Sequence, residues 1–316
     1  MSRIDEMRLM AKVARLYYEQ GIRQQEITER LNIHQSRVSR LLKKARETNL
    51  VRISVGTPAG VFPDLEEALE SRFRLSEAIV IDSDGGDERI VRDLGAAAAF
   101  YLEATVRPEA VVGISSWSRS LFAMVDALHP NENGKGGKVV QILGGVGNVS
   151  TEYQATALAQ RLAGLIGASP VLLQAPAVVG SSQARSVLIN DPAVRVAAQW
   201  FSRIDLALVG IGSMRPSSLL TSSGNIFSDR ELQQVRKKGA VGDICFQFID
   251  QNGKPVQSPL AQRVIGINLA ELKRARRVAG IAGGIEKTQA ILAALKGAWI
   301  NVLITDKRTA ERVLAQ

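Results

Sequence analysis

The segment QQEITERLNIHQSRVSRLLKKARE, residues 24–47, holds two short amphipathic patterns on either side of Asn32-Ile33. Ile27 and Leu31 place an apolar ridge on the first pattern. The second repeats apolar residues at helical spacing: Val38, Leu41, Leu42 and Ala45. The segment therefore predicts two helices joined by a tight turn, each with an inner face, which is the layout of a helix-turn-helix DNA-binding unit.

The second predicted helix turns a polar and basic face away from its apolar residues. Taking about 100° per residue from Val38, this face is centred on Ser36, Arg40 and Lys43. Arg can bridge guanine O6 and N7 and Gln can bridge adenine N6 and N7, whereas Ser and Lys can hold phosphate oxygens. The candidate DNA-binding residues are the centre of the face and its flanks: Gln35, Ser36, Arg37, Ser39, Arg40, Lys43 and Lys44.

Base contacts are expected from the first turns of this helix, because they enter the major groove in helix-turn-helix proteins. The residues of those turns are Gln35, Ser36, Arg37 and Arg40. Lys43 and Lys44 lie further along, where neutralisation of the DNA backbone is expected. His34 either starts the helix or contacts a phosphate, with base reading as the weaker alternative. A solvated amphipathic hairpin is the alternative for the whole segment, and the coincidence of turn, inner pattern and outer cations disfavours it.

Length and charge predict two folding units of different character. The chain has 316 residues, 46% of them hydrophobic, which suffices for a sizeable core. Residues 1–55 hold 12 Lys and Arg against 6 Asp and Glu, while the whole chain holds 40 against 31. Most of the positive surplus thus lies in the first unit, where it would attract a phosphate backbone.

Cysteine and histidine usage argues against disulfides and metal sites. Cys245 is the only cysteine, and of the two histidines, His34 and His129, the first lies in the predicted DNA-binding unit. We expect no metal and no cofactor. The N-terminus lacks the apolar core of a signal peptide, and no uninterrupted apolar run reaches about 18 residues. A reducing cytoplasm is the expected location, with no membrane contact.

The glycine- and proline-rich stretch GTPAGVFP, residues 56–63, predicts the boundary between the two units. We expect a helix-turn-helix domain over residues 1–56 and an effector and oligomerisation domain over residues 57–316. Residues 7–18 predict a supporting helix before the motif. LVRISV at 50–55 predicts a short strand after it, and residues 64–73 predict a helix that follows the boundary.

The second unit alternates β-rich runs with helical stretches. The runs lie about 30 residues apart, which is typical of βαβ units and predicts an α/β fold with a parallel sheet. They are AIVI at 78–81, AVVGI at 110–114, KVVQIL at 138–143, PVLLQA at 170–175 and DLALVGI at 205–211, with RRVAGIA and INVLIT near the end. Between them, GAVGDICFQFIDQNGKPV predicts an antiparallel excursion with an Asn-Gly turn at 250–253.

Ligands of open parallel sheets bind beyond the carboxyl ends of the strands, where helix N-termini offer free N–H groups. Three segments come at such ends. GISSWSRS supplies Ser115, Ser116, Ser118, Arg119 and Ser120, which suit a phosphate or, alternatively, a polar loop that caps a helix. LGGVGN supplies Gly144 and Gly145, and AGGIEK supplies Gly283, Gly284 and Lys287. A lysine in the first turn of a helix is unfavourable without an anion nearby, so Lys287 is expected to contact a ligand.

The sequence lacks the usual catalytic motifs. It has no Walker A loop, no H-E-x-x-H and no G-x-S-x-G. Acid–base chemistry would have to rest on carboxylates such as Asp243 or on Lys287. We therefore predict no catalytic residues and no enzyme activity.

Five blocks in order give the chain a resemblance to the SorC family of bacterial sugar-responsive transcriptional regulators. These are residues 17–53, GISSWSRSL, VVQILGGVG, DLALVGIGSM with GAVGDICFQFIDQNGKPV, and the stretch from VAGIAGGIEK to the C-terminal AERVL. The resemblance implies a larger Rossmann-like α/β domain, similar to ribose-phosphate isomerase and glucosamine-phosphate deaminase but used as a sensor. It also implies that Ser118, Arg119 and Ser120 hold a phosphate and that Gln154 and Lys287 touch the ligand.

Leu143 stands where some relatives carry an Arg, which favours a singly phosphorylated sugar or polyol over a bisphosphate. The leading hypothesis is a repressor of a sugar or polyol catabolic operon that binds double-stranded operator DNA as a homodimer or homotetramer. An activator that requires the ligand would carry the same residues. The rival is a sugar-phosphate isomerase or deaminase with an appended DNA-binding segment, for which the chain offers only Asp243 as a base.

Overall fold

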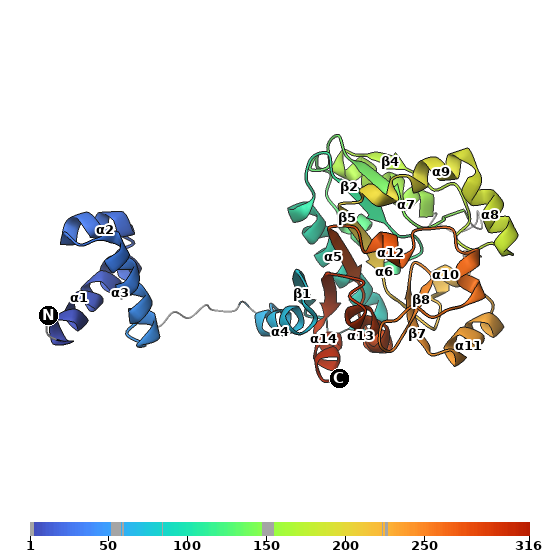
Figure 1. Ribbon diagram of the computed structural model, residues 1–316. Coiled ribbons are helices and arrows are strands. Elements are labelled where there is room, and N and C mark those ends of the chain that lie inside the picture. Colours follow the sequence, from blue (N-terminus) through green and yellow to red (C-terminus); the bar gives the residue numbers. More distant parts are fainter. Residues whose placement is uncertain are drawn as a thin grey trace. The chain divides into compact units, whose positions relative to one another are not determined.

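The computed structural model describes residues 3–51, 58, 60–83, 85–146, 155–222, 224 and 227–316. The chain divides into two compact units, Met1–Pro58 and Ala59–Gln316 (Figure 1). The expected boundary between residues 56 and 57, and residues 52–55 of the expected strand, lie outside the described residues. Among the described helices, none has the length and apolar character needed to cross a bilayer.

The described residues of the first unit form three helices, α1 (Arg3–Ala14), α2 (Gln24–Leu31) and α3 (Gln35–Glu47), with a π-helical turn, Arg15–Glu19, after α1. Asn32 ends α2 with φ 49°, a left-handed conformation that Asn tolerates better than most residues. The core joins α1 to α2 and α3: Met10, Val13, Ala14, Leu16, Ile27, Val38, Leu41, Leu42 and Ala45. The predicted helices and their inner faces are confirmed.

The second unit is built on a parallel sheet of seven strands in the order β1-β10-β9-β5-β2-β3-β4. The strands are β1 (Glu77–Ile81), β2 (Val111–Ile114), β3 (Lys138–Gln141), β4 (Ser169–Val171), β5 (Leu206–Gly210), β9 (Arg277–Ile281) and β10 (Val302–Asp306). Each of these strands overlaps one of the predicted β-rich runs, so the prediction of a parallel sheet is confirmed. β4 is shorter than expected, with only three residues.

Helices cover both faces of this sheet. α5 (Asp87–Thr105), α6 (Arg119–Ala127) and α7 (Ala155–Ile166) pack on one face with Val112 and Ile114 of β2. α4 (Pro63–Phe73), α13 (Thr288–Lys296) and α14 (Lys307–Leu314) pack on the other face. Because successive side chains of a strand point to opposite faces, the continuous apolar runs of the sequence fill both layers.

The remaining helices flank the second face. They are α8 (Ser182–Asn190), α9 (Pro192–Ala198), α10 (Ser218–Ser222), α11 (Asp229–Lys237) and α12 (Leu269–Leu272), with short 3-10 turns at Phe201–Arg203, Pro259–Arg263 and Ile285–Lys287. α11 starts with a capping box in which Ser228 and Glu231 satisfy each other's backbone N–H groups.

An antiparallel sheet, β6 (Gly212–Ser213), β7 (Ala240–Ile244) and β8 (Gln247–Asp250), follows β5. The β7–β8 hairpin turns at Cys245-Phe246, with φ 52° and 59°, and this turn was not predicted. The Phe246 N–H donates to Asp243 Oδ2 at 2.9 Å, which holds the turn in place of a glycine. The predicted turn at 250–253 is confirmed, since Gly253 has φ 77° and Ile249 pairs antiparallel with Pro255 across it.

The strand order reverses beside β2. The chain runs from β2 to β3 and β4 on one side, and then from β5 to β9 and β10 on the other. The connections after β2 and β5 thus leave in opposite directions and open a crevice at the carboxyl ends of these strands, where parallel sheets bind ligands.

Candidate functional site

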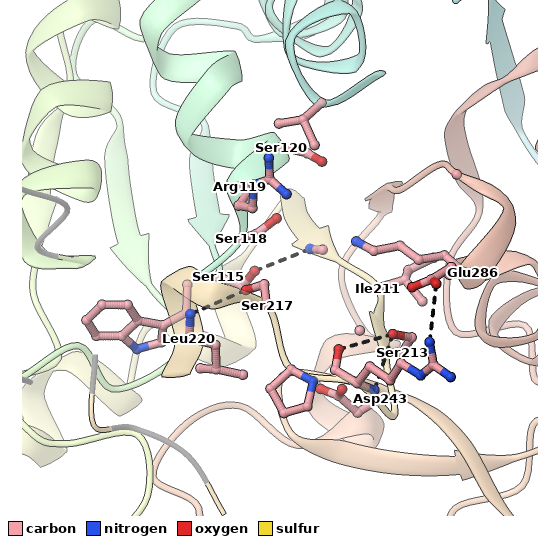
Figure 2. Close-up of a pocket in the computed structure, with 18 of the residues that line it drawn as sticks. Ser115, Ser118, Arg119, Ser120, Ile211, Ser213, Ser217, Leu220, Asp243 and Glu286 are labelled. Carbon is pink, nitrogen blue, oxygen red and sulfur yellow. Dashed lines mark hydrogen bonds and ion pairs between the residues drawn. The ribbon is translucent and has the colours of Figure 1, made fainter. Parts of the chain in front are cut away.

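A pocket of about 420 Å³ lies at this crevice. Segments that follow β2, β5 and β9 form its walls, together with the β7–β8 hairpin and the first turn of α5 (Figure 2). The lining includes Asp87, Ile90, Val91, Ser115, Ser116, Trp117, Ser118, Arg119, Ser120, Leu143, Gly210, Ile211, Gly212, Ser213, Arg215, Pro216, Ser217, Leu220, Asp243, Cys245, Phe246, Gly283, Gly284, Glu286 and Lys287. Segments far apart in the sequence therefore meet in one cavity.

The segment after β2 presents hydroxyls, a guanidinium and a helix N-terminus to the pocket. Ser118 is the N-cap of α6, and its side chain makes no capping hydrogen bond. Arg119 follows in the first turn, and Figure 2 shows it beside Ser118 and Ser120. Gly210 leaves room for Ser118, since a Cβ there would lie 2.6 Å from Ser118 Oγ. This arrangement suits an anion.

The two residues before Ser118 fix the shape of the segment. Ser116 Oγ donates to the Leu143 carbonyl at 2.8 Å, and the Trp117 indole N–H donates to the Gly144 carbonyl at 3.1 Å. Trp117 has φ 62°, a strained conformation that these bonds hold. Ser116 is buried and its hydroxyl is engaged, so it lines the pocket mainly as part of the wall.

The second predicted segment contributes less than expected. Leu143 lines the pocket, but Gly144 and Gly145 do not. Their amides donate to the carbonyls of Ile265 and Ala175, both at 2.9 Å, and a Cβ on Gly144 would collide with the Pro176 carbonyl. Gly144 therefore permits close packing of neighbouring loops rather than ligand approach. Gln154 lies outside the described residues.

The third predicted segment is held by a buried network behind the pocket. The Gly284 N–H donates to Asp306 Oδ2 at 2.7 Å and to Thr309 Oγ1 at 3.0 Å. Asp306 and Thr309 are buried, with 1% and 0% of their surface exposed. Gly284 has φ 93°, so a side chain there would be strained. The network fixes the turn that places Lys287 at the start of α13.

Asp243 and Lys287 bring opposite charges into the pocket. Burial raises the pKa of the Asp243 carboxyl to about 6, although the Phe246 N–H and the charge of Lys287 act in the opposite direction. Burial lowers the pKa of the Lys287 ammonium, the Asp243 charge opposes this shift, and the Arg119 charge adds to it. Gly212 leaves the space that the Asp243 carboxylate occupies. Burial also raises the pKa of the neighbouring Cys245 thiol.

The cations of the pocket differ in their pairing. Arg215 pairs with Glu286 at 3.3 Å, and both side chains are exposed (Figure 2). Among the described residues, Arg119 and Lys287 make no hydrogen bond or ion pair through their side chains. Two cations in one pocket repel each other, and the Arg119 charge adds to the lowering of the Lys287 pKa that burial mainly causes. An anion between them would relieve this repulsion.

Several residues that line the pocket were not predicted from the sequence. Asp87 and Ile90 come from α5, Arg215 and Ser217 follow β6, and Phe246 belongs to the unexpected hairpin turn. DLALVGIGSM ends at a strand carboxyl end like the other three segments, so its position was a usable signal for Gly210 to Ser213. α5 and the hairpin reach the pocket only through tertiary packing, which no local pattern reveals.

The outer face of α3 is a second candidate site. Six of its predicted residues are exposed, Gln35, Ser36, Ser39, Arg40, Lys43 and Lys44, and Arg37 is half-buried. Arg40 Nε donates to the Ser36 carbonyl at 3.2 Å, and Lys43 lies 3.8 Å from Glu47. Lys44 instead pairs with Glu6 of α1 at 2.9 Å, and this bond lowers the pKa of Glu6. His34 is the exposed N-cap of α3.

Comparison with known proteins gives consistent matches over both units. Residues 60–315 match the family described as "Putative sugar-binding domain". The sorbitol operon regulator of Klebsiella pneumoniae is 32% identical over 317 residues, which cover 99% of this chain and 100% of that protein. The deoxyribonucleoside regulator of Bacillus subtilis (strain 168) is also 32% identical, over 98% of each chain.

Solved structures agree with these matches. The crystal structure of the full-length sorbitol operon regulator SorC from Klebsiella pneumoniae aligns with a TM-score of 0.74 at 30% identity and covers 98% of this chain and 99% of its own. The structure described as "Putative sugar-binding domain of transcriptional regulator DeoR from Pseudomonas syringae pv. tomato" aligns with a TM-score of 0.63 at 35% identity, over 80% of this chain and 99% of that one.

Proposed function

The chain belongs to the SorC family of sugar-responsive transcriptional regulators, and we propose that its pocket holds a phosphorylated sugar or polyol that controls DNA binding by α2 and α3. The relatives are named as transcriptional regulators and not as enzymes, so the chain is a regulator. In this proposal residues 1–56 form the helix-turn-helix domain. Residues 57–316 form a Rossmann-like effector and oligomerisation domain of the isomerase and deaminase type.

The observation that carries the proposal is the pairing of two cations with a helix N-terminus in one pocket. Arg119 and Lys287 line the same cavity as the first turn of α6. A phosphate between them would accept from free N–H groups, from the Ser118 hydroxyl and from the guanidinium, while its charge would offset the repulsion between the cations. Ser115, Ser120, Gly283 and Gly284 line the same pocket.

The rest of the pocket supports a small polar ligand with one phosphate. A volume of about 420 Å³ lies at the small end of ligand pockets, which range over roughly 300–1,000 Å³. The Asp243 carboxylate and the Ser213 and Ser217 hydroxyls also line the pocket and would pair with hydroxyl groups of a sugar or polyol. Leu143 adds an apolar wall that offers a second phosphate no partner.

The outer face of α3 supports the DNA-binding part of the proposal. Gln35, Ser36 and Arg40 are exposed at the start of the helix and would reach base edges, with Arg37 beside them. Lys43 would contact phosphates, and Lys44 would do so after leaving Glu6. A homodimer or homotetramer would present two such helices to a double-stranded operator in the cytoplasm. Release of the DNA by the ligand would make the protein a repressor of a sugar or polyol catabolic operon.

A thermal-shift screen tests the pocket. We expect phosphorylated hexitols and pentoses to raise the melting temperature, because a ligand at 100 times its Kd adds about 2.7 kcal/mol. The unphosphorylated compounds should have no effect. Arg119→Gln should abolish the shift. Arg161→Gln, which removes an exposed arginine that pairs with Asp126 on the surface, should keep it.

The same screen has outcomes that contradict the proposal. Equal shifts of the melting temperature with phosphorylated and unphosphorylated compounds would mean that the pocket does not recognise a phosphate group. An unchanged shift in Arg119→Gln would remove Arg119 from the site. Turnover of any sugar phosphate in the panel would revive an isomerase or deaminase with Asp243 as its base.

A further inference from the structure

We propose that occupancy of the pocket is transmitted to the segment that leads to the DNA-binding unit through a short bonded path, Gly284 to Asp306 to Ile81 to Val61. The inference rests on the proposed function and specifies how that pocket is coupled to the DNA-binding unit. Asp306 is a positioning residue in this path, because it lines no part of the pocket.

The path ends where the chain enters the second unit. Val61 pairs antiparallel with Ile81, the last residue of β1. The Phe62 carbonyl accepts from the Leu65 and Glu66 N–H groups at 3.0 Å and so starts α4. Lys307, the first residue of α14, lies over the Phe62 ring at 5.0 Å. The segment is thus attached at the carboxyl edge of the sheet, the same edge that carries the pocket.

α4 and β1 are tied together along their length. β1 is an edge strand of the sheet, and two glutamates of α4 accept from its outer N–H groups. Glu70 Oε1 accepts from Ala78 N at 2.8 Å, and Glu66 Oε1 accepts from Val80 N at 2.9 Å. A shift of the end of β1 is therefore carried into α4 and Phe62 as one body.

Asp306 joins β1 to the pocket turn. Its backbone pairs with Ile81 in the β1–β10 ladder, so Ile81 lies between Val61 and Asp306. Its carboxylate accepts from Thr309 N at 3.0 Å, from Thr309 Oγ1 at 2.6 Å and from Gly284 N at 2.7 Å. A buried carboxylate that loses a partner becomes costly, so the Gly284 turn and the end of β10 are expected to move together.

The pocket end of the path carries the ligand contact. The Lys287 N–H donates to the Gly284 carbonyl at 2.9 Å, and Gly283, Gly284, Glu286 and Lys287 all line the pocket. Gly283 also lies against Asp306, where a Cβ would collide with the carboxylate. The turn is closely packed, so it has no room to move by itself. An anion that draws Lys287 toward Arg119 therefore displaces Gly284 and strains the hydrogen bond from the Gly284 N–H to Asp306. The small shift of a packed network is the kind of event that couples distant sites.

Hydrogen exchange on the full chain with inorganic phosphate as the probe tests this path. In the wild-type protein we expect phosphate to slow exchange in residues 115–121 and 283–288, and also in residues 60–66, which lie outside the pocket. Asp306→Asn should keep the phosphate effect at 115–121 and lose it at 60–66. Lys307→Ala, a milder change that removes the contact over Phe62, should weaken the effect at 60–66. Lys296→Ala, at the exposed end of α13, is the matched control.

Three other results of this experiment would contradict the inference, and they differ in which part of it they contradict. Protection of 115–121 and 283–288 without 60–66 in the wild type would leave the proposed function standing and remove the path. Full protection of 60–66 in both Asp306→Asn and Lys307→Ala would show that coupling does not pass through Asp306. Absence of protection in all three segments would mean that the pocket binds no phosphate, which contradicts both the proposed anion site and the inference.

Discussion

Asp243 shows how one residue can be costly to the fold and useful to the site. Its carboxyl is held against Gly212 by the hairpin turn, where burial raises its pKa to about 6. The charged form is therefore disfavoured in the folded protein and is tolerated beside Lys287. Functional sites commonly contain such groups, because ligand hydroxyls can supply the hydrogen bonds that burial removed.

The raised pKa predicts a pH dependence of stability. An Asp whose pKa lies above its ordinary value of 3.8 holds a proton more tightly when folded, so its contribution to stability falls as the pH rises from about 4 to 6. Asp243→Asn removes this loss. Between pH 4 and 7, the free energy of unfolding of the variant should therefore rise by about 1–2 kcal/mol relative to that of the wild type. The full pKa shift corresponds to about 3 kcal/mol, and the value is smaller because the pocket opens to solvent.

Denaturant unfolding at several pH values measures this gain. The matched control is Asp126→Asn, which removes an exposed carboxylate that pairs with Arg161. Its difference from the wild type should stay within about 1 kcal/mol and should lack the same rise between pH 4 and 6. A flat difference for Asp243→Asn would mean that the carboxyl is well solvated in the folded protein.

At the scale of elements, local patterns predicted the strands well and the pocket incompletely. The strands from β1 to β5 come from short apolar runs that begin about 30 residues apart, and this spacing favours parallel pairing. The Cys245-Phe246 turn was missed because neither residue signals a left-handed conformation. Its cause is the Asp243 carboxylate, which bonds Phe246 N across the turn. A side chain that stabilises a turn from three residues away leaves little trace in the sequence.

The candidate site, too, was predicted in part. Ser118, Arg119 and Lys287 were predicted to contact a ligand because each follows a strand that ends at one edge, and they do line one pocket. Gly144 and Gly145 follow a strand equally, but their backbone packs against Pro176 and Ala175. Sequence pattern identifies a strand end, whereas the strand's place in the sheet decides whether that end faces the crevice.

α4 and β1 form an element pair whose stability can be measured. Glu70→Ala leaves the Ala78 N–H of the edge strand without its partner at a partly buried position. We expect a loss of about 1–3 kcal/mol in the free energy of unfolding, the cost of an unmade buried hydrogen bond. Glu67→Ala on the exposed face of α4 should change stability by no more than about 0.5 kcal/mol. Equal effects of the two substitutions in denaturant unfolding would mean that Glu70 does not cap β1.

At the scale of the whole molecule, the proposed function assigns DNA recognition to the first unit and control by a ligand to the second. The first exposes a basic helix face, and the second encloses a pocket with two cations. A ligand changes DNA binding only by its different affinity for the states that bind and release DNA. A 100-fold change in DNA affinity requires a coupling of about 2.7 kcal/mol, which the few hydrogen bonds around Asp306 could supply if they differ between the two states.

DNA binding with and without ligand tests the central claim most directly. The full chain is titrated into a duplex that it selects from a random pool, at moderate salt, with and without the phosphorylated hexitol or pentose that gives the largest thermal shift. We predict at least about a tenfold change in Kd with ligand, which corresponds to about 1.4 kcal/mol. Arg119→Gln should keep the DNA affinity and lose the change, and Arg40→Ala should lose the preference for the selected sequence. Binding without sequence preference, or the same change with ligand in Arg119→Gln, would contradict the account.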